Sequence, residues 1–270
     1  MRNEGASKNC YFLRLDDHRY RPTELTSGAW STSEQHISPV IGLMVHAVER
    51  FLAQRAPDDL HIARISADIL GVLPIEDFEI SVDIVRAGRT IELLEATVVA
   101  GGRAAVRARF WRLSAQDTST VAGGAEQAPA TPEAMPSWRM ADVWPGGFIG
   151  SLDVRAAAPP VPGRTTAWVT SDVPLVGNES ASTLAQFIGF VDTANGISVR
   201  ESPQEWMFPN LDLTIHLFRQ PRGRWVGLET TVVFGASGHG TTTAGLFDVD
   251  GQVGYASQIL TVRSLQPARV

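Results

Sequence analysis

The sequence has almost no cysteine and almost no lysine. Cys10 is the single cysteine and Lys8 the single lysine among 270 residues, so the other 22 of the 23 basic residues are arginines. A lone cysteine excludes a disulfide framework and a cysteine-based zinc site. A lone lysine near the N-terminus argues against covalent catalysis by a lysine amine.

Positive charge and long apolar runs are also scarce. The 23 basic and 29 acidic residues give a net charge of -6, which argues against a nucleic-acid partner bound through a basic surface. No apolar run approaches the length of a membrane span, and the polar N-terminus lacks the apolar core of a signal peptide. With 44% hydrophobic residues the chain can still bury a substantial core. We therefore expect a cytoplasmic globular protein without a membrane or nucleic-acid partner.

A segment rich in Ala, Gly, Pro, Ser and Thr divides the chain into two halves. Such a composition without apolar periodicity is typical of a linker. The aromatic residues near its end are costly to leave in water, so we expect that part to pack on the body of the protein. The predicted organisation is an N-terminal tail at 1–20, an N-terminal domain at 21–115, a linker at 116–160 and a C-terminal domain at 161–270.

Each half shows the same order of elements: a short strand, an apolar helix and four further strands. Turn residues such as Gly101-Gly102 and Asp250-Gly251 separate the strands. In the first half the elements are predicted at 25–31, from 38 onward, and at 61–70, 78–85, 90–99 and 104–113. In the second half they are predicted at 166–171, 182–197, 211–218, 225–234, 241–247 and 253–263.

Both predicted helices are apolar almost all round, at residues 39–48 and 183–191. A helix of this kind has to be wrapped by the rest of the fold. One such helix for each antiparallel sheet of about five strands describes a sheet curled around a central helix, the hotdog arrangement. The predicted fold class is therefore α+β, as a tandem or double hotdog.

Four segments together resemble the TesB-like (type II) acyl-CoA thioesterases, which are double hotdogs. The resemblance covers nearly the whole chain outside the tail and the linker, and it depends on the order and spacing of the segments. They are SPVIGLMVHAVERFL at 38–52, GFVDTANG at 189–196, NLDLTIHLFRQP at 210–221 and YASQILTVR at 255–263.

The resemblance implies a catalytic site in which an Asp, a hydroxyl or amide residue and a Gln hold the attacking water. In this chain the Asp is Asp192 and the Gln is Gln258. The family's Thr position falls on Asn210, which offers both a donor and an acceptor in place of a hydroxyl. Asp212 or Thr214 would take this role if the register were displaced by two residues.

The start of the first helix departs from the family. The family commonly has a Gly-Gly pair there, whose N–H groups can face the thioester oxygen, whereas this chain has Ile37-Ser38. We expect Ser38 to be the N-cap, because Pro39 suits the first helical position. Ser38 and His36 are predicted to contact substrate, together with Gly42.

The predicted function is hydrolysis of an acyl-CoA or acyl-carrier thioester, with no cofactor. No metal site is expected, because the histidines lack H-x-x-x-H spacing. We expect one active site per chain, since Glu49, at the place in the first helix analogous to Asp192, has no matching Gln. The quaternary state stays open, with a homo-oligomer paired through sheet edges as one option.

Two other functions remain open. One is a hotdog dehydratase or hydratase, which needs a catalytic His near an Asp, as in G-D-x-N-P-x-H; no His follows Asp192 closely. The other is a double hotdog that binds acyl thioesters or protein partners without turnover. The departures at Asn210 and Ile37-Ser38 keep this second alternative open.

Overall fold

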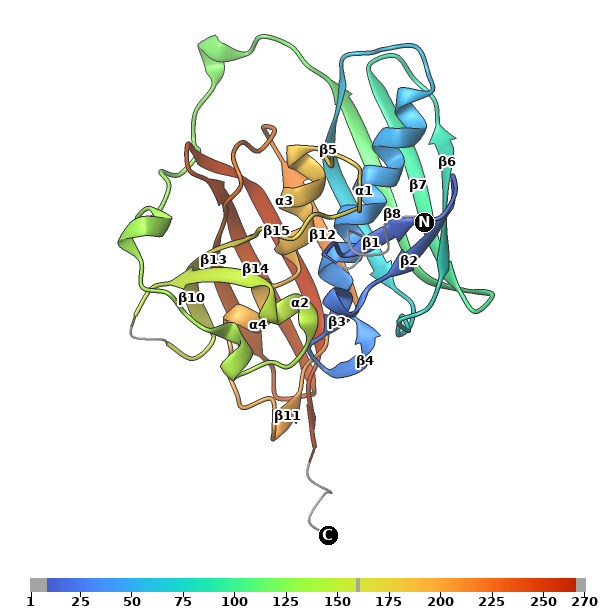
Figure 1. Ribbon diagram of the computed structural model, residues 1–270. Helices are drawn as coiled ribbons and strands as arrows, with labels where there is room; N and C mark the ends of the chain where they lie inside the picture. Colours follow the sequence, from blue (N-terminus) through green and yellow to red (C-terminus); the bar gives the residue numbers. More distant parts are fainter. Residues whose placement is uncertain (1–8, 159–160, 266–270) are drawn as a thin grey trace.

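The computed structural model describes residues 9–158 and 161–265, so Lys8 lies outside the described residues. One antiparallel sheet of 12 strands curls around two central helices, α1 (Ile37–Ala53) and α3 (Thr183–Val191), which confirms the predicted double hotdog (Figure 1). Its strand order is β1 (Phe12–Arg14), β2 (Arg19–Pro22), β6 (Phe78–Arg86), β7 (Ile91–Ala100), β8 (Arg103–Ser114), β5 (Leu60–Ile69), β12 (Asp212–Leu217), β15 (Gly251–Thr261), β14 (His239–Asp248), β13 (Val226–Phe234), β10 (Arg164–Ser171) and β9 (Leu152–Ala156).

The first half of the chain wraps α1, and the second half wraps α3. Every residue of α1 from Ser38 to Val48 is buried, as expected for a helix with no polar face. Strand β12 pairs with β5 on one side and with β15 on the other. The two halves are thereby joined into one continuous sheet, with a single large hydrophobic core inside it.

The two central helices touch at a pair of glycines. A Cβ added to Gly42 on α1 would lie 2.7 Å from the carbonyl oxygen of Ala185 and 2.8 Å from Cα of Gly189, both on α3. Only a glycine lets the two backbones approach so closely. This contact helps to set how the helices cross, and therefore which helix ends meet.

The N-terminal segment differs from the expected tail. Strands β1 and β2 pair with each other and extend the sheet beyond β6, and Phe12 and Tyr20 are fully buried. Cys10, also expected in the tail, is buried as well. The strands have only three and four residues, which is too short for a period of two to stand out in the sequence.

The segment expected as a linker packs on both halves: Phe148 contacts the ring of His36 in the first half and that of Phe190 in the second. Within it Trp144 and Phe148 are buried, as expected from their size, and Trp168 of β10 donates from Nε1 to the carbonyl of Ala130 at 2.7 Å. Residues 152–156 form β9, so they belong to the sheet rather than to a connection. The short elements are α2 (Gly147–Gly150), α4 (Ala194–Ile197), β3 (Ser27–Gly28), β4 (Ser31–Gln35), β11 (Trp206–Met207), β16 (Arg263–Ser264) and four 3-10 turns (Glu24–Thr26, Ser119–Val121, Pro132–Ala134 and Met140–Asp142).

Among the described residues, no helix has the length and apolar character that crossing a membrane requires.

Candidate active site

Asp192 lies at the end of α3, not in the middle of a longer helix. The helix expected at 182–197 is interrupted after Val191, where Asp192 is the C-cap, and α4 begins at Ala194. The hydroxyl and the backbone N–H of Thr193 both donate to the carbonyl of Phe190, at 2.6 and 3.1 Å. A hydroxyl that bonds back to a nearby carbonyl competes with the regular helix ladder. The carboxyl group is therefore carried on a helix terminus.

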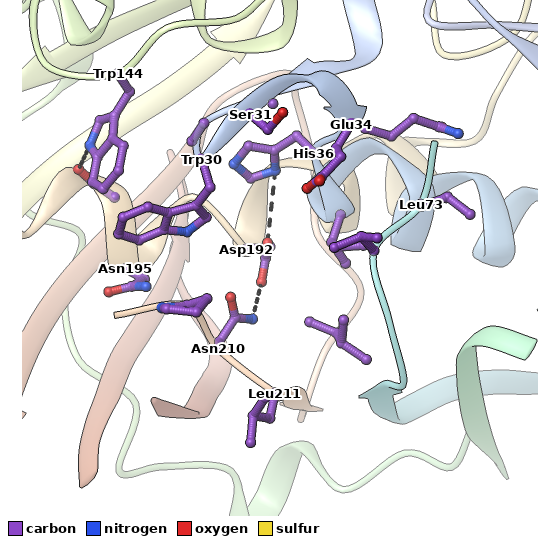
Figure 2. Close-up of a pocket in the computed structure, with 18 of the residues that line it drawn as sticks. Trp30, Ser31, Glu34, His36, Leu73, Trp144, Asp192, Asn195, Asn210 and Leu211 are labelled. Atoms are coloured by element: carbon purple, nitrogen blue, oxygen red, sulfur yellow. Dashed lines mark hydrogen bonds and ion pairs between the residues drawn. The ribbon is translucent and has the colours of Figure 1, made fainter. Parts of the chain in front are cut away.

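Two side-chain amides hold the Asp192 carboxyl group. Nδ2 of Asn210 and Nε2 of Gln258 each donate to Oδ1 of Asp192, both at 2.7 Å. Asn210 lies two residues before β12 and Gln258 belongs to β15, so three separate elements meet here. Figure 2 shows the contact between Asn210 and Asp192. The three residues expected from the family resemblance are thus in direct contact.

Burial makes Asp192 titrate near neutrality. The residue is only 6% exposed, and this burial raises the pKa of its carboxyl group from 3.8 to about 7. The hydrogen bonds from Asn210 and Gln258 lower the pKa but do not compensate for the lost hydration, and the nearby carboxylate of Asp212 raises it further. A carboxylate with a pKa near the working pH is well suited to be a general base.

His36, rather than Ser38, is the N-cap of α1. Nδ1 of His36 accepts a hydrogen bond of 3.1 Å from the backbone N–H of Ser38, and the helix begins at Ile37. The same Nδ1 lies 3.8 Å from Oδ2 of Asp192 (Figure 2). Burial lowers the pKa of His36 to about 4, so its ring is neutral at pH 7.

A cavity of about 330 Å³ opens beside Asp192, His36 and Asn210. Figure 2 shows Trp30 and Trp144 on one side of these residues and Leu73 on the other. Most of the lining is apolar, and none of the lining residues is a lysine or an arginine. A mainly apolar cavity with a few convergent polar groups is typical of a small-molecule site. The other lining residues are Gly28, Ala29, Ser31, Glu34, Gln35, Ile37, Ile69, Leu70, Gly71, Val72, Met140, Asn195, Gly196, Pro209 and Leu211.

Two other expected site residues do not line this cavity. Ser38 is fully buried and its hydroxyl has no partner within residues 9–158 and 161–265, and Gly42 lies at the helix crossing. The structure does not support the alternative register, in which Asp212 or Thr214 would replace Asn210. Asp212 accepts a hydrogen bond of 2.6 Å from the backbone N–H of Ile259, and the hydroxyl of Thr214 contacts that of Ser66.

The sequence did not predict the aromatic side of the cavity, formed by Trp30 and Trp144. Trp30 and Trp144 pack edge to face with ring centroids 4.9 Å apart, and both contact Phe208. Trp144 is further held by a 2.8 Å hydrogen bond from Nε1 to the carbonyl of Gly196. The one available signal was the cost of exposing these rings, which indicates packing but not the place where they pack.

The analogous place on α1 has different chemistry. Glu49 accepts a 2.8 Å hydrogen bond from the hydroxyl of Ser182, the N-cap of α3. Nearby, Glu179 contacts His46 and pairs with Arg14 and Arg50. No glutamine binds Glu49 among the described residues, so one active site per chain stays our prediction.

Comparison with known proteins agrees with this architecture. The N-terminal domain model of the acyl-CoA thioesterases matches residues 26–113, and the C-terminal domain model matches residues 125–262. A search of curated proteins finds no match.

Several solved structures share the fold. The acyl-CoA thioesterase II TesB2 of Mycobacterium marinum is similar with a TM-score of 0.70 at 15% identity, covering 98% of each chain. A hot dog protein of unknown function from Alicyclobacillus acidocaldarius has a TM-score of 0.73 at 13% identity, covering 98% of this chain and 100% of the other. A dehydratase domain of the CurF module of the curacin polyketide synthase has a TM-score of 0.52 at 12% identity, covering 96% and 99%.

The structural similarity shows the fold, and the two domain matches cover most of the chain and show the family. The protein therefore belongs to the acyl-CoA thioesterases, has the double hotdog fold and is a thioester hydrolase.

Proposed function

We propose that Asp192 activates the water that hydrolyses an acyl thioester, with Asn210 and Gln258 as its partners. The observation that carries this proposal is the one-sided binding of the carboxyl group. Both amide donors bind Oδ1, while Oδ2 makes no hydrogen bond with the described residues. One oxygen is thus fixed in position and the other is free to accept a proton from water.

The two amides also have acceptor atoms to offer. Oε1 of Gln258 is buried and has no partner among the described residues, and buried acceptors of this kind usually bind water or a ligand. Asn210 lines the cavity, whereas Gln258 does not. We therefore assign Asn210 to the water directly, and Gln258 to the position of Asp192.

Hydrolysis needs no group beyond these and water. The water oxygen attacks the thioester carbonyl carbon, one of its protons moves to Oδ2 of Asp192, and the carbonyl electron pair moves to oxygen. When this tetrahedral intermediate collapses, the carbon–sulfur bond breaks and the thiolate takes the proton from Asp192. The carboxylate is then ready for another turnover.

The substrate class follows from the family and from the cavity lining. The apolar walls, including both tryptophans, suit the acyl part of an acyl-CoA. Of the residues expected to bind substrate, His36 lines the cavity. Ser38 holds the His36 ring through its backbone N–H, and Gly42 acts indirectly by bringing the helix ends together. An acyl group on a carrier protein presents the same thioester, and the substrate series below distinguishes the two carriers.

One observation favours a dehydratase or hydratase as a second candidate. The sequence places no His close after Asp192, but the fold brings His36 of the other half to within 3.8 Å of it. A histidine base needs a free lone pair facing the substrate. Here Nδ1 already accepts the N–H of Ser38, which leaves the proton on Nε2 and makes the ring a donor. The geometry therefore supports hydrolysis better.

The test is release of free thiol from acyl-CoA thioesters of short, medium and long chain, and from the same acyl groups on a carrier protein. Asp192→Asn should lower kcat by about 100- to 10,000-fold, the usual contribution of a general base. Glu49→Gln, at the analogous place on α1, is the matched control and should retain activity. An Asp192→Asn enzyme as active as wild type would exclude Asp192 as the base. Hydration of an enoyl-CoA without thiol release would favour the second candidate.

A further inference from the structure

The imidazole of His36 is held in a single tautomer by the start of α1. Its Nδ1 accepts the backbone N–H of Ser38 at 3.1 Å, so the lone pair of Nδ1 is in use. In a neutral imidazole the other nitrogen then carries the proton. His36 therefore presents Nε2–H as a hydrogen-bond donor.

This donor has no acceptor in the described part of the chain. Nε2 of His36 makes no hydrogen bond with the described residues, although the ring is largely buried and lines the cavity. The ring is kept in place by Phe148, whose centroid lies 4.7 Å away. A fixed and unpartnered donor beside the proposed base is available to a ligand.

The hydrogen bond between His36 and Ser38 also occupies one backbone donor at the start of α1. Backbone N–H groups at a helix N-terminus can stabilise an anion, and in the family a Gly-Gly pair stands at this place. In this chain the N–H of Ser38 is already bound by His36, so it is not free for a thioester oxygen. A group other than this N–H has to meet the negative charge that develops there.

We propose that His36 is a catalytic residue of this chain, whose Nε2–H donates a hydrogen bond to the thioester carbonyl oxygen. The proposal rests on the proposed hydrolase function and adds to it the group that stabilises the oxyanion. When water attacks, the carbonyl electron pair moves onto that oxygen, and the hydrogen bond from Nε2–H strengthens. His36 keeps its proton throughout, since the water proton goes to Asp192.

A neutral histidine is a suitable donor in this position. Oδ2 of Asp192 lies 3.8 Å from Nδ1, and Glu34 also lines the cavity, so both nearby carboxyl groups would attract a proton to the ring. Burial acts in the opposite direction and lowers the pKa of His36 to about 4. The ring therefore stays neutral while Asp192 is ionised, and each residue is in the form that its role needs.

Two substitutions of His36 separate its roles. His36→Ser keeps a good N-cap but removes the ring nitrogens. His36→Phe keeps the ring volume against Phe148 but removes both the cap and the donor. Because loss of one oxyanion donor typically costs about 100- to 1,000-fold in kcat, both variants should lose kcat by that factor. KM and the affinity for an acyl-CoA analogue with CH2 in place of sulfur should change little.

A matched control tests for a purely structural role. Ser182→Ala removes the equivalent N-cap of α3, where the Ser182 hydroxyl accepts from the N–H of Ala185 at 3.0 Å. This variant should lower Tm and leave kcat largely unchanged. If His36→Ser kept the wild-type kcat, or if kcat fell only in proportion to the folded fraction, His36 would not be the donor.

The pH profile distinguishes this proposal from the function on which it rests. Both His36 variants should keep the wild-type rise of kcat/KM with pH, at a lower rate, because that rise belongs to Asp192. A His36 variant that abolished the rise would identify His36 as the base and overturn the proposal. Full activity of Asp192→Asn would instead refute the proposed base, whatever the His36 variants show.

Discussion

Gln258 donates a 2.7 Å hydrogen bond from Nε2 to Oδ1 of Asp192 and so ties β15 to the end of α3. The bond favours the charged form of the carboxyl group and opposes the effect of burial on its pKa. The pH at which Asp192 ionises is thus a property of this contact as well as of burial.

Replacing Gln258 should move the pH dependence of activity. In Gln258→Leu, Asp192 loses one of its two amide donors, so its pKa should rise above about 7 by roughly one pKa unit, the energy of one hydrogen bond to a charged group. The measurement is the rise of kcat/KM with pH, which should move to higher pH. Thr242→Val, opposite Gln258 on β14, removes a hydroxyl that no described residue contacts by a hydrogen bond, and it should not move the profile. An unmoved profile in Gln258→Leu would contradict a contribution from this bond.

The buried carboxyl group of Asp192 should also make stability depend on pH. Its pKa in the folded protein, about 7, lies above the ordinary 3.8, so folding favours the protonated form. This stabilisation is fully present below about pH 4 and is lost as the pH rises to about 7. The free energy of unfolding should therefore fall over this range by up to about 4 kcal/mol, at about 1.4 kcal/mol for each pKa unit.

Urea unfolding of wild type and Asp192→Asn at several pH values measures this contribution as a difference. The amide introduced by Asp192→Asn carries no charge at any of these pH values. The variant should therefore gain stability relative to wild type as the pH rises from about 4 to about 7, the range over which wild type loses its stabilisation. A difference between the two proteins that stayed constant with pH would show that the pKa of Asp192 is close to its ordinary value.

The two glycines at the helix crossing should respond differently to alanine. The new methyl of Gly42→Ala would meet the backbone of Ala185 and Gly189 at less than 3 Å, so this variant should lose about 1–3 kcal/mol in the free energy of unfolding. Gly189→Ala is the matched control, because its Cβ would meet only Cα of Gly42, at 3.7 Å. It should be neutral, or more stable by up to about 1 kcal/mol from helix propensity. Equal effects of the two substitutions would contradict the close approach at Gly42.

Removing one partner of a buried ion pair should strongly destabilise the second half. The fully buried Asp248 accepts two hydrogen bonds of 2.6 Å from the guanidinium of Arg219. Arg219→Met would leave this carboxylate without its cation and should cost about 3–5 kcal/mol in urea unfolding. Arg224→Met, which removes an exposed pair with Asp172, should cost about 1 kcal/mol or less. Similar losses in both variants would contradict the distinction between buried and exposed pairs.

Much of the architecture could be predicted because it depends on local patterns. Alternation along 211–218 predicted β12, and the absence of a polar face on 39–48 predicted a helix enclosed by a sheet. The resemblance to the family identified Asp192, Asn210 and Gln258 before their contacts were known. Short elements such as β1 and β2 were not predicted, because an alternating pattern cannot be recognised over three or four residues.

Residue order along the chain therefore specified the two helices, most of the strands and the candidate catalytic groups. Contacts between the halves were decided by tertiary packing. The close approach at Gly42 helps to place the end of α3 beside the start of α1, and this brings His36 next to Asp192. Neither the neutral state of His36 nor the raised pKa of Asp192 can be read from their neighbours in sequence. Both depend on burial, which exists only once the sheet has closed around the two helices.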